Sequence, residues 1–153
     1  ASAAQRYFPA LFSPEFSRGR ECITNAALNY GYAIIRGSVA RHLAVYGFVP
    51  ALGLHHKSAL NSFNLADDIM EPFRPVVDLL VCSLIAPDDT ELTPKLKRSL
   101  FNALNLDIVS GSSHHSVSYA IERLVHSLSR SMADGKASLC LPELTALKQH
   151  KYE

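Results

Sequence analysis

The segment GLHHKSALNSFNLADDIMEPFRPVVD places two adjacent histidines, His55 and His56, ahead of three acidic residues in an otherwise apolar run. On a helix, Asp68 and Glu71 are three positions apart and Asp67 and Glu71 are four apart, so their carboxylates lie on one face. Carboxylates that close repel one another, and a divalent cation between them removes the repulsion. Mg²⁺ and Mn²⁺ prefer carboxylate oxygens, and Mn²⁺ also accepts an imidazole nitrogen. The spacing is therefore typical of a site for Mg²⁺ or Mn²⁺.

The same acidic residues also have a purely structural interpretation. Asp67 and Asp68 would fall in the first turn of a helix, where the helix dipole stabilises negative side chains by about 0.3–1 kcal/mol each. Glu71 can pair with Arg74, and Arg74 with Asp78, on a solvated helix face. The spacing alone leaves both interpretations open.

A second pair of histidines, His114 and His115, lies in a Ser-rich stretch with no acidic residue close by. A histidine in a loop is more often an ordinary polar residue than a ligand. We therefore expect neither of them to bind a metal. Tyr30 and Tyr32 are expected to be packing and surface residues rather than platforms for nucleic-acid bases.

The length of 153 residues favours a single compact domain, and 48% hydrophobic residues are enough for one core. The formal net charge of +1 favours neither nucleic acid nor any other class of partner. Three scattered cysteines, Cys22, Cys82 and Cys140, fit neither a CxxC metal site nor a disulfide framework, which favours a reducing compartment. No apolar run is long enough to span a bilayer, so we expect a cytoplasmic protein without a membrane partner.

Apolar residues at three- and four-residue steps predict a succession of helices. The expected helices cover residues 1–12, Ile23 to Tyr46, Leu65 to Leu84, Thr93 to Asn105, Val117 to Ala133, and Pro142 towards His150. Asn64 is expected to be the N-cap of the third helix. Pro72 and Pro75 are expected to kink that helix, since proline interrupts the hydrogen-bond ladder.

Local signals also mark the second half of the chain. Thr93 followed by Pro94 is typical of a helix start. Gly and Ser within residues 106–115 indicate a small hairpin or only a loop. The whole chain is predicted to be an all-α bundle of five or six helices.

Four stretches together resemble one known family. They are LNYGYAIIRG at residues 28–37, PALGLHH at 50–56, FNLADDIMEPFRPVVD at 63–78 and HSVSYAIERLVHSL at 115–128. They are similar to the CRISPR-associated spacer integrases, the "Cas one" family, and to its type II branch in particular. The resemblance implies that residues 1–153 form the carboxy-terminal, all-helical catalytic domain of such an integrase, without the amino-terminal β domain that joins two copies.

The resemblance also implies a ligand set for one Mg²⁺ or Mn²⁺. The family's Gly-x-x-His element falls on residues 53–56, which makes the second histidine, His56, the metal-binding one. The acid of the family's D-x-x-E-x-x-R-P run falls on Glu71. Asp68, one helical turn earlier, would be a second ligand or a group that orients the ligands, and Asp67 would be a secondary acid.

The activity implied by the family is the insertion of new spacers into a CRISPR array. The 3′-hydroxyl of a short DNA attacks a phosphodiester at the edge of a repeat, and the same site could cleave branched DNA as an endonuclease. The family's first catalytic glutamate would directly precede Ala1, so residues 1–153 alone are expected to be inactive. The implied partners are double-stranded DNA, a second copy of the chain and the small dimeric adaptation protein "Cas two", in a prokaryotic cytoplasm. Basic residues that could hold DNA phosphates are Arg36, Arg41, Lys57 and Arg74.

Two other functions remain open at this point. One is an all-helical metal phosphohydrolase of the His-Asp kind, which would need further histidines and aspartates at metal-binding spacing. His114 and His115 are the only other paired histidines. The other is a non-catalytic module that binds DNA or a partner protein, which the absence of the family's first glutamate favours.

Overall fold

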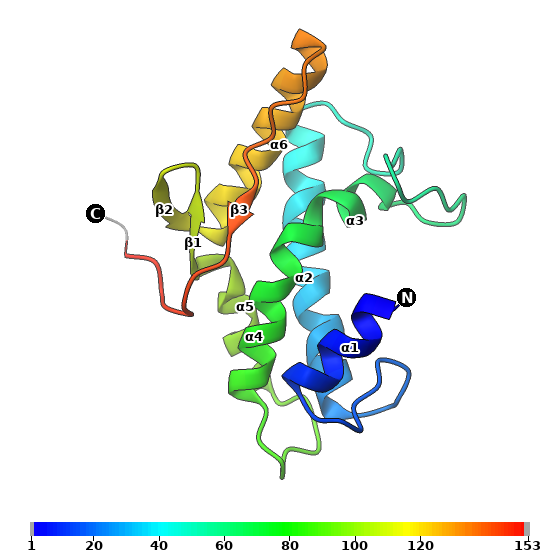
Figure 1. Cartoon of the computed structure of the whole chain (residues 1–153), viewed down its shortest axis with the longest axis vertical. Helices are drawn as coiled ribbons and strands as arrows, with labels where there is room; N and C mark the ends of the chain where they lie inside the picture. Colours follow the sequence, from blue (N-terminus) through cyan, green and yellow to red (C-terminus); the bar gives the residue numbers. More distant parts are fainter. Residues whose placement is uncertain (1, 152–153) are drawn as a thin grey trace.

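The long helix α2 (Ile23–Val45) runs through the middle of the molecule (Figure 1). The computed structural model describes residues 2–151. The other helices are α1 (Ser2–Leu11), α3 (Asn64–Met70), α4 (Arg74–Leu84), α5 (Pro94–Phe101) and α6 (Val117–Asp134). Three short strands, β1 (Asp107–Ser110), β2 (Ser113–Ser116) and β3 (Pro142–Glu143), form one antiparallel sheet beside α6. The predicted helical bundle is confirmed, with a small sheet added to it.

Helix α2 is central because it buries apolar residues against α3, α4, α5 and α6. Its fully buried apolar residues are Ala27, Leu28, Ile35, Val39 and Leu43. Each buried leucine or isoleucine of this kind contributes about 1.5–3 kcal/mol relative to an exposed one. Gly31 faces α4, where a Cβ would lie 2.5 Å from Val77 Cγ1, so glycine permits a close approach of the two helices. Neither α2 nor any other helix within residues 2–151 is long and apolar enough to cross a membrane.

The predicted helix over residues 65–84 is divided into two. Helix α3 gives way to a 3₁₀ turn, η1 (Glu71–Phe73), and α4 follows directly. Proline has no N–H to donate and its ring clashes with the carbonyl four residues earlier, so Pro72 and Pro75 disrupt a continuous helix. Each lies instead in the first turn of its own helical element, where proline is tolerated. The expected kink is thus a break, and it places Glu71 in the turn between two helices.

Asn64 does not cap α3 as expected. It is the first residue of the helix and is 4% exposed. Its Nδ2 donates hydrogen bonds to the carbonyls of Ala51 at 3.0 Å and Ser58 at 2.8 Å. Phe63 takes the N-cap position instead, without a side-chain hydrogen bond. Asn64 therefore ties the loop between α2 and α3 onto the helix.

Two other local predictions are confirmed. Thr93 caps α5, because its Oγ1 accepts a hydrogen bond from the Leu96 N–H at 3.2 Å, and Pro94 is the first helical residue. Residues 107–116 form a hairpin in which β1 pairs with β2. Gly111 in its turn has φ +70°, a left-handed conformation that favours glycine.

The predicted helix from Pro142 towards His150 is wrong, because this segment completes the sheet. Strand β3 pairs antiparallel with β1, which lies between β2 and β3. Further along, the Asp107 N–H donates to the Lys148 carbonyl at 2.9 Å, and the His150 N–H donates to the Asn105 carbonyl at 2.9 Å. An unpaired strand edge leaves backbone groups without partners, so pairing with β1 outweighs the helical spacing of the segment. Proline is tolerated in β3 because β3 is an edge strand.

Gly31→Ala should destabilise the protein, whereas Gly37→Ala in the same helix should not. The added methyl group at Gly31 would overlap Val77, and overpacking of this kind costs roughly 1–3 kcal/mol. At Gly37 no atom lies within 4 Å of the new Cβ, so alanine should stabilise the helix. The expected gain is about 0.5–1 kcal/mol. Urea unfolding measures both changes, and equal stability of the two variants would contradict the close packing of α2 on α4.

Candidate functional site

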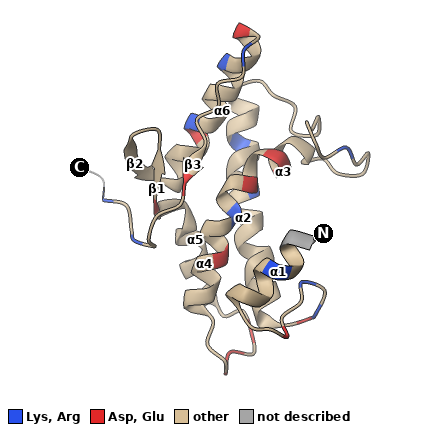
Figure 2. Ribbon diagram, viewed as in Figure 1, with Lys and Arg blue, Asp and Glu red and all other residues tan. Residues whose placement is uncertain are grey.

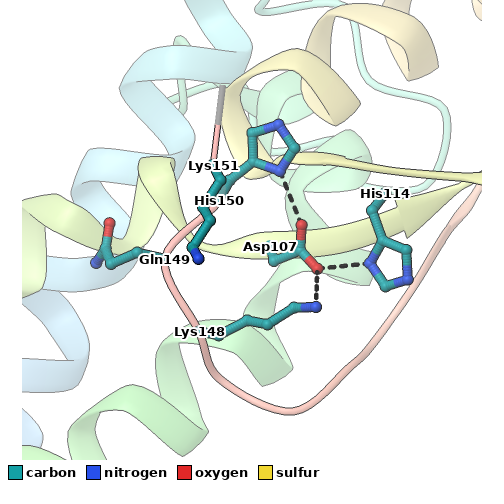
Figure 3. Close-up of a pocket in the computed structure, with 6 residues that line it drawn as sticks. All are labelled: Asp107, His114, Lys148, Gln149, His150 and Lys151. Carbon is teal, nitrogen blue, oxygen red and sulfur yellow. Dashed lines mark hydrogen bonds and ion pairs between the residues drawn. The ribbon is translucent and has the colours of Figure 1, made fainter. Parts of the chain in front are cut away.

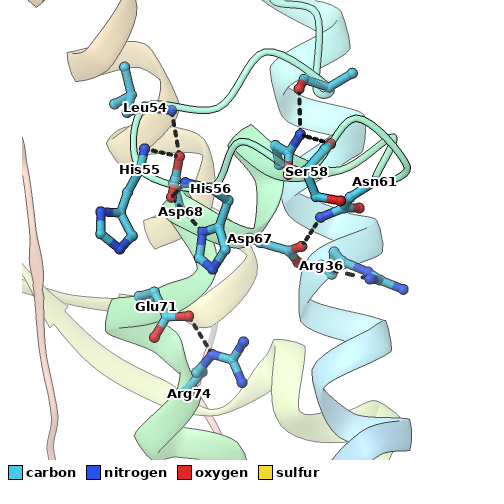
Figure 4. A network of polar contacts seen from close by, with 12 residues as sticks. Arg36, Leu54, His55, His56, Ser58, Asn61, Asp67, Asp68, Glu71 and Arg74 are labelled. Carbon is cyan, nitrogen blue, oxygen red and sulfur yellow. Dashed lines mark hydrogen bonds and ion pairs between the residues drawn. The ribbon is translucent and has the colours of Figure 1, made fainter. Parts of the chain in front are cut away.

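The loop before α3 wraps around the carboxylate of Asp68 (Figure 4). Asp68 Oδ2 accepts hydrogen bonds from the N–H groups of Leu54 at 2.6 Å and His55 at 3.0 Å. Its Oδ1 accepts from the His56 N–H at 3.1 Å and lies 2.6 Å from His56 Nδ1. The side chain of Asp68 is only 8% exposed. Four donors therefore occupy the four lone-pair positions of one buried carboxylate.

These hydrogen bonds fix the charge of Asp68 and the tautomer of His56. Burial of the carboxyl favours protonation, but hydrogen bonds from the His55 N–H, the His56 ring and N–H, and the Leu54 N–H hold the pKa of Asp68 below its ordinary value. An ionised carboxylate only accepts, so His56 must donate its Nδ1–H. In the neutral imidazole, the Nε2 atom of His56 then carries the lone pair. Metal-binding histidines are commonly held by a carboxylate in this way.

Gly53 begins this loop because a side chain would not fit there. A Cβ at this position would lie 2.2 Å from the His56 carbonyl oxygen, 2.8 Å from Asn64 Cβ and 3.0 Å from Asp68 Oδ2. The carbonyl belongs to the backbone, so it can move only if the loop moves. The Gly-x-x-His spacing of the sequence therefore reflects a loop that turns back tightly onto α3.

Glu71 lines the same open cavity as His56 and Asp68. The cavity has a volume of about 540 Å³, and its lining is completed by Leu54 and His55. The side chain of Glu71 is 52% exposed, and its Oε1 accepts a hydrogen bond from Arg74 Nε at 2.8 Å. This bond uses Oε1, so Oε2 can still accept or coordinate.

Asp67 is directed away from this cavity, although the sequence pattern groups it with the other two acids. Its Oδ2 accepts a hydrogen bond from Asn61 Nδ2 at 2.7 Å, and its Oδ1 lies 3.9 Å from Arg36 Nη1 (Figure 4). Successive residues on a helix point about 100° apart, so Asp67 and Asp68 cannot face the same point. The structure brings together His56, Asp68 and Glu71 and separates Asp67 from them.

The four basic residues predicted to hold DNA phosphates do not share one place. Arg36 and Arg74 line a second cavity together with Asp67. Lys57 is exposed and directly follows His56 in the loop, whereas Arg41 is exposed further along α2. Figure 2 shows basic and acidic residues close together where α2, α3 and α4 meet.

The donor atoms at the first cavity suit a hard divalent cation but do not form a complete cage. Within residues 2–151, no group of three or more His, Cys, Asp or Glu side chains is arranged to hold a metal ion. Asp68 uses its lone pairs on the loop, which leaves His56 Nε2 and a Glu71 oxygen as the two donors. One imidazole and one carboxylate fit Mg²⁺ or Mn²⁺, because such ions bind through few protein ligands and keep several waters.

A second group of titratable side chains, which the sequence pattern does not predict, surrounds Asp107. Asp107 Oδ2 lies 2.5 Å from His114 Nδ1 and 3.2 Å from Lys148 Nζ, and Oδ1 lies 2.8 Å from His150 Nδ1 (Figure 3). The expectation that no acidic residue lies near His114 is therefore wrong. Pairing about the turn at Gly111 places Asp107 and His114 diagonally on one face of the sheet, so only the assumption of a hairpin would have revealed the contact.

Asp107 holds the segment that follows β3 on the sheet. Its side chain is 3% exposed, and burial favours protonation. Hydrogen bonds from His150, His114 and Lys148 outweigh this effect and lower the pKa of Asp107 to about 2. Lys148 and His150 both belong to the segment after β3, so the ionised carboxylate binds that segment to β1.

Comparisons with known proteins point to one family. The family model described as "CRISPR associated protein Cas1" matches residues 2–95. A CRISPR-associated endonuclease Cas1 from Neisseria meningitidis serogroup C is 46% identical over 156 residues, covering 100% of this chain and 51% of that protein. A CRISPR-associated endonuclease Cas1 from Thermus thermophilus is 36% identical over 103 residues, covering 59% of this chain and 33% of that protein. This chain therefore spans about half the length of the Neisseria relative. Its match to the Thermus relative covers a smaller share of that protein.

A solved structure extends the comparison to three dimensions. A casposase bound to integration product matches with a TM-score of 0.64 and 27% sequence identity. The match covers 78% of this chain and 40% of the casposase chain. The likeness therefore extends over most of this chain.

Gly53→Ala should displace the loop from Asp68. The new Cβ would overlap the His56 carbonyl, so the N–H groups of residues 54–56 should lose protection against hydrogen exchange, by roughly 10-fold or more. Gly19→Ala is the matched control, since only Ser17 Oγ, at 3.9 Å, lies near its Cβ. Hydrogen exchange followed by NMR measures both variants. Unchanged protection in Gly53→Ala would show that the loop does not need this close approach.

Asp107→Asn should destabilise the protein at neutral pH and less so in acid. The carboxyl has a pKa of about 2 in the fold against an ordinary value of 3.8, so its contribution is complete above about pH 4 and is lost as the pH falls through about 2. The difference in unfolding free energy between the wild type and Asp107→Asn should therefore shrink from about pH 6 to about pH 2. Urea unfolding at several pH values tests this, with the exposed Asp134→Asn as the control. A difference that stays constant with pH would contradict the assigned role of the charge.

Proposed function

Because the chain belongs to the Cas1 family of CRISPR-associated proteins, we propose that it is the catalytic part of a metal-dependent DNA integrase and endonuclease. The observation that carries the proposal is the hydrogen bond of His56 to Asp68 beside Glu71, because it leaves an imidazole nitrogen and a carboxylate oxygen at one cavity. Residues 1–153 would be the carboxy-terminal helical domain of such an enzyme. A further glutamate ligand would come from the part of the longer family chains that lies outside these residues.

His56 and Glu71 are the proposed ligands of Mg²⁺ or Mn²⁺. Asp68 acts through His56, since its lone pairs are already used and its charge fixes the imidazole with Nε2 free to coordinate. When bound, the ion polarises a phosphoryl oxygen and stabilises negative charge on the attacking or leaving oxygen. Arg74 keeps Glu71 oriented through its hydrogen bond, and Arg36 and Arg74 attract DNA phosphates to the neighbouring surface.

The proposed reaction is a single transesterification. The 3′-oxygen of a short double-stranded DNA forms a bond to the phosphorus of a phosphodiester at the edge of a CRISPR repeat. The bond from that phosphorus to the 3′-oxygen of the repeat strand breaks, the attacking hydroxyl loses its proton to solvent, and the leaving oxygen gains one. With water in place of the 3′-hydroxyl, the same groups would cleave branched DNA. The similarity to a casposase bound to integration product supports DNA as the substrate.

The proposed assembly follows the family. A second copy of the chain and the small dimeric adaptation protein Cas two would be the protein partners, in a prokaryotic cytoplasm.

The second candidate function is a non-catalytic module that binds DNA or a partner, which the incomplete ligand set within residues 2–151 favours. A His-Asp phosphohydrolase has less support, because it would need further histidine ligands and His114 lines a different cavity from His56.

Titration of residues 1–153 with Mn²⁺ tests the metal site without any activity assay. NMR signals of residues beside His56 and Glu71 should broaden in proportion to bound Mn²⁺. His56→Ala and Glu71→Ala should each weaken Mn²⁺ binding by about 10-fold or more, whereas the exposed Glu91→Gln should not. Broadening that persists unchanged in His56→Ala would exclude this histidine as a ligand.

Strand transfer tests the reaction in a full-length family chain that contains residues 1–153. Labelled short DNA should join a repeat-containing DNA only when Mg²⁺ or Mn²⁺ is present. His56→Ala and Glu71→Ala should lower the joining rate by more than about 100-fold, and Asp68→Asn by about 10–100-fold because it acts through His56. Residues 1–153 alone should join little or no DNA. Normal joining by His56→Ala would exclude His56 as a ligand, whereas no joining by the wild-type full-length chain would leave DNA or partner binding as the function.

A further inference from the structure

A second cavity, with a volume of about 320 Å³, adjoins the one that holds His56 and Glu71. Three arginines line it: Arg18 from the loop after α1, Arg36 from α2, and Arg74 at the start of α4. Arg74 connects the two cavities, because it also hydrogen-bonds Glu71. Guanidinium groups repel one another, so three of them around one small space need negative charge nearby.

The acids of this cavity do not balance its three arginines. Arg74 pairs with Glu71 at 2.8 Å, and Arg36 lies 3.9 Å from Asp67. Within the described residues, Arg18 forms no ion pair with a carboxylate, and its hydrogen bonds go to neutral amides. Arg18 therefore brings a positive charge that the cavity's own acids leave without a direct partner.

Asp78 is a buried acid near Arg18 and Arg74, but within the described residues it forms no ion pair with either of them. The two carboxylate oxygens of Asp78 accept hydrogen bonds from the hydroxyls of Tyr7 and Tyr32. Burial raises the pKa of Asp78 above its ordinary value, although the two hydroxyls and the nearby arginines oppose the rise. Asp78 therefore serves to hold the two tyrosines and does not contact Arg18.

Arg18 is held in place before any ligand arrives. Its Nη1 donates to Asn25 Oδ1 at 2.6 Å, and its Nη2 donates to Asn29 Oδ1 at 2.7 Å. Asn25 is 5% exposed, and its Nδ2 donates to the carbonyls of Ser17 at 2.8 Å and Arg20 at 2.7 Å. One buried amide thus fixes both the loop and the arginine on it. A side chain that is already ordered loses less entropy when it binds a ligand.

The ring of Tyr32 brings two of the three guanidinium groups together. The guanidinium carbon of Arg74 lies 4.6 Å from the ring centroid, and that of Arg18 lies 5.5 Å from it. The negative face of an aromatic ring attracts cations, so Tyr32 lowers the cost of placing both arginines at one cavity. The N–H groups of the two arginines that are not already hydrogen-bonded can then donate to one anion.

We propose that the arginine cavity, formed by Arg18, Arg36 and Arg74, binds a phosphate group of the DNA strand that enters the neighbouring His56 and Glu71 site. This inference rests on the proposed function and adds Arg18 to it as a residue that positions the strand. Arginine forks match phosphate oxygens with two parallel hydrogen bonds, which fixes the position of the phosphate as well as its charge. Because Arg74 lies between the two cavities, a phosphate held there places the adjoining phosphodiester beside Glu71.

Binding of DNA without metal tests this proposal. Residues 1–153 are titrated, in EDTA, into a fluorescently labelled duplex oligonucleotide with single-stranded ends, and anisotropy is measured at several salt concentrations. Arg18→Gln should weaken binding roughly 10-fold and lower the slope of log affinity against log salt by about 0.7–0.9, the value of one phosphate contact. Arg20→Gln makes the same charge change on the same loop, but Arg20 is exposed and should have a much smaller effect on both quantities. Equal affinity and slope in the two variants would overturn the proposal.

The role of Asn25 gives an independent measurement. Asn25→Ala should weaken DNA binding when Arg18 is present and should have little effect in the Arg18→Gln background, because both changes remove the same contact. Thermal unfolding of each variant separates this from a loss of fold, and Arg18→Lys, which keeps the charge without the fork, should bind DNA more tightly than Arg18→Gln. Fully additive effects of Asn25→Ala and Arg18→Gln would contradict the positioning role.

The use of EDTA separates this proposal from the metal mechanism. A loss of DNA binding in Arg18→Gln together with normal joining by His56→Ala would support the arginine cavity and refute the catalytic assignment. Unchanged DNA binding in Arg18→Gln together with metal-dependent joining would refute the arginine cavity and support the metal mechanism.

Discussion

The buried charge of Asp68 is the constraint on which the candidate site depends. The N–H groups of Leu54, His55 and His56 all point at one carboxylate, and so does the ring of His56. Hydrogen bonds to an ionised acceptor are roughly twice as strong as neutral ones, and a buried charge remains stable only while such donors surround it. The course of residues 54–56 and the orientation of the His56 ring therefore depend on a single negative charge.

The fold could be predicted from the sequence where the signals are local. Helical spacing, the Thr93 cap and the turn at Gly111 depend on neighbours within a few residues, and they gave the right elements. The segment from Pro142 to His150 has helical spacing too, but its backbone pairs with β1, more than thirty residues earlier in the chain. Helix propensity is only a weak guide, because pairing with a segment that is distant in the chain can override it. The prediction that Asn64 caps α3 is wrong for the same reason, because its side-chain amide hydrogen-bonds carbonyls of the preceding loop.

Which of the predicted residues line one cavity could be anticipated only in part from the sequence. Spacing along a helix correctly grouped Asp68 with Glu71, and it also grouped Asp67, which the structure turns toward Arg36. The break at the two prolines moved Glu71 out of the regular helix, so angles assumed for a continuous helix did not apply. The resemblance to a family selected His56 over its neighbour, a choice that spacing alone could not make. Arg18 carried no sequence signal, because its place depends on a buried amide seven residues later.

The sheet has a consequence for the order in which this protein can fold. Strand β1 meets β2 through a tight turn, but it meets β3 only after the whole of α6 has been made. Until residues 142–150 are available, one edge of β1 presents its N–H and C=O groups to any extended chain nearby. During synthesis the chain therefore passes through a state in which β1 is paired with β2 alone. In that state its other edge can pair with a strand from another protein. The charge of Asp107 attracts Lys148 and His150 to that edge. It therefore favours pairing with the protein's own segment over pairing with a strand from another chain.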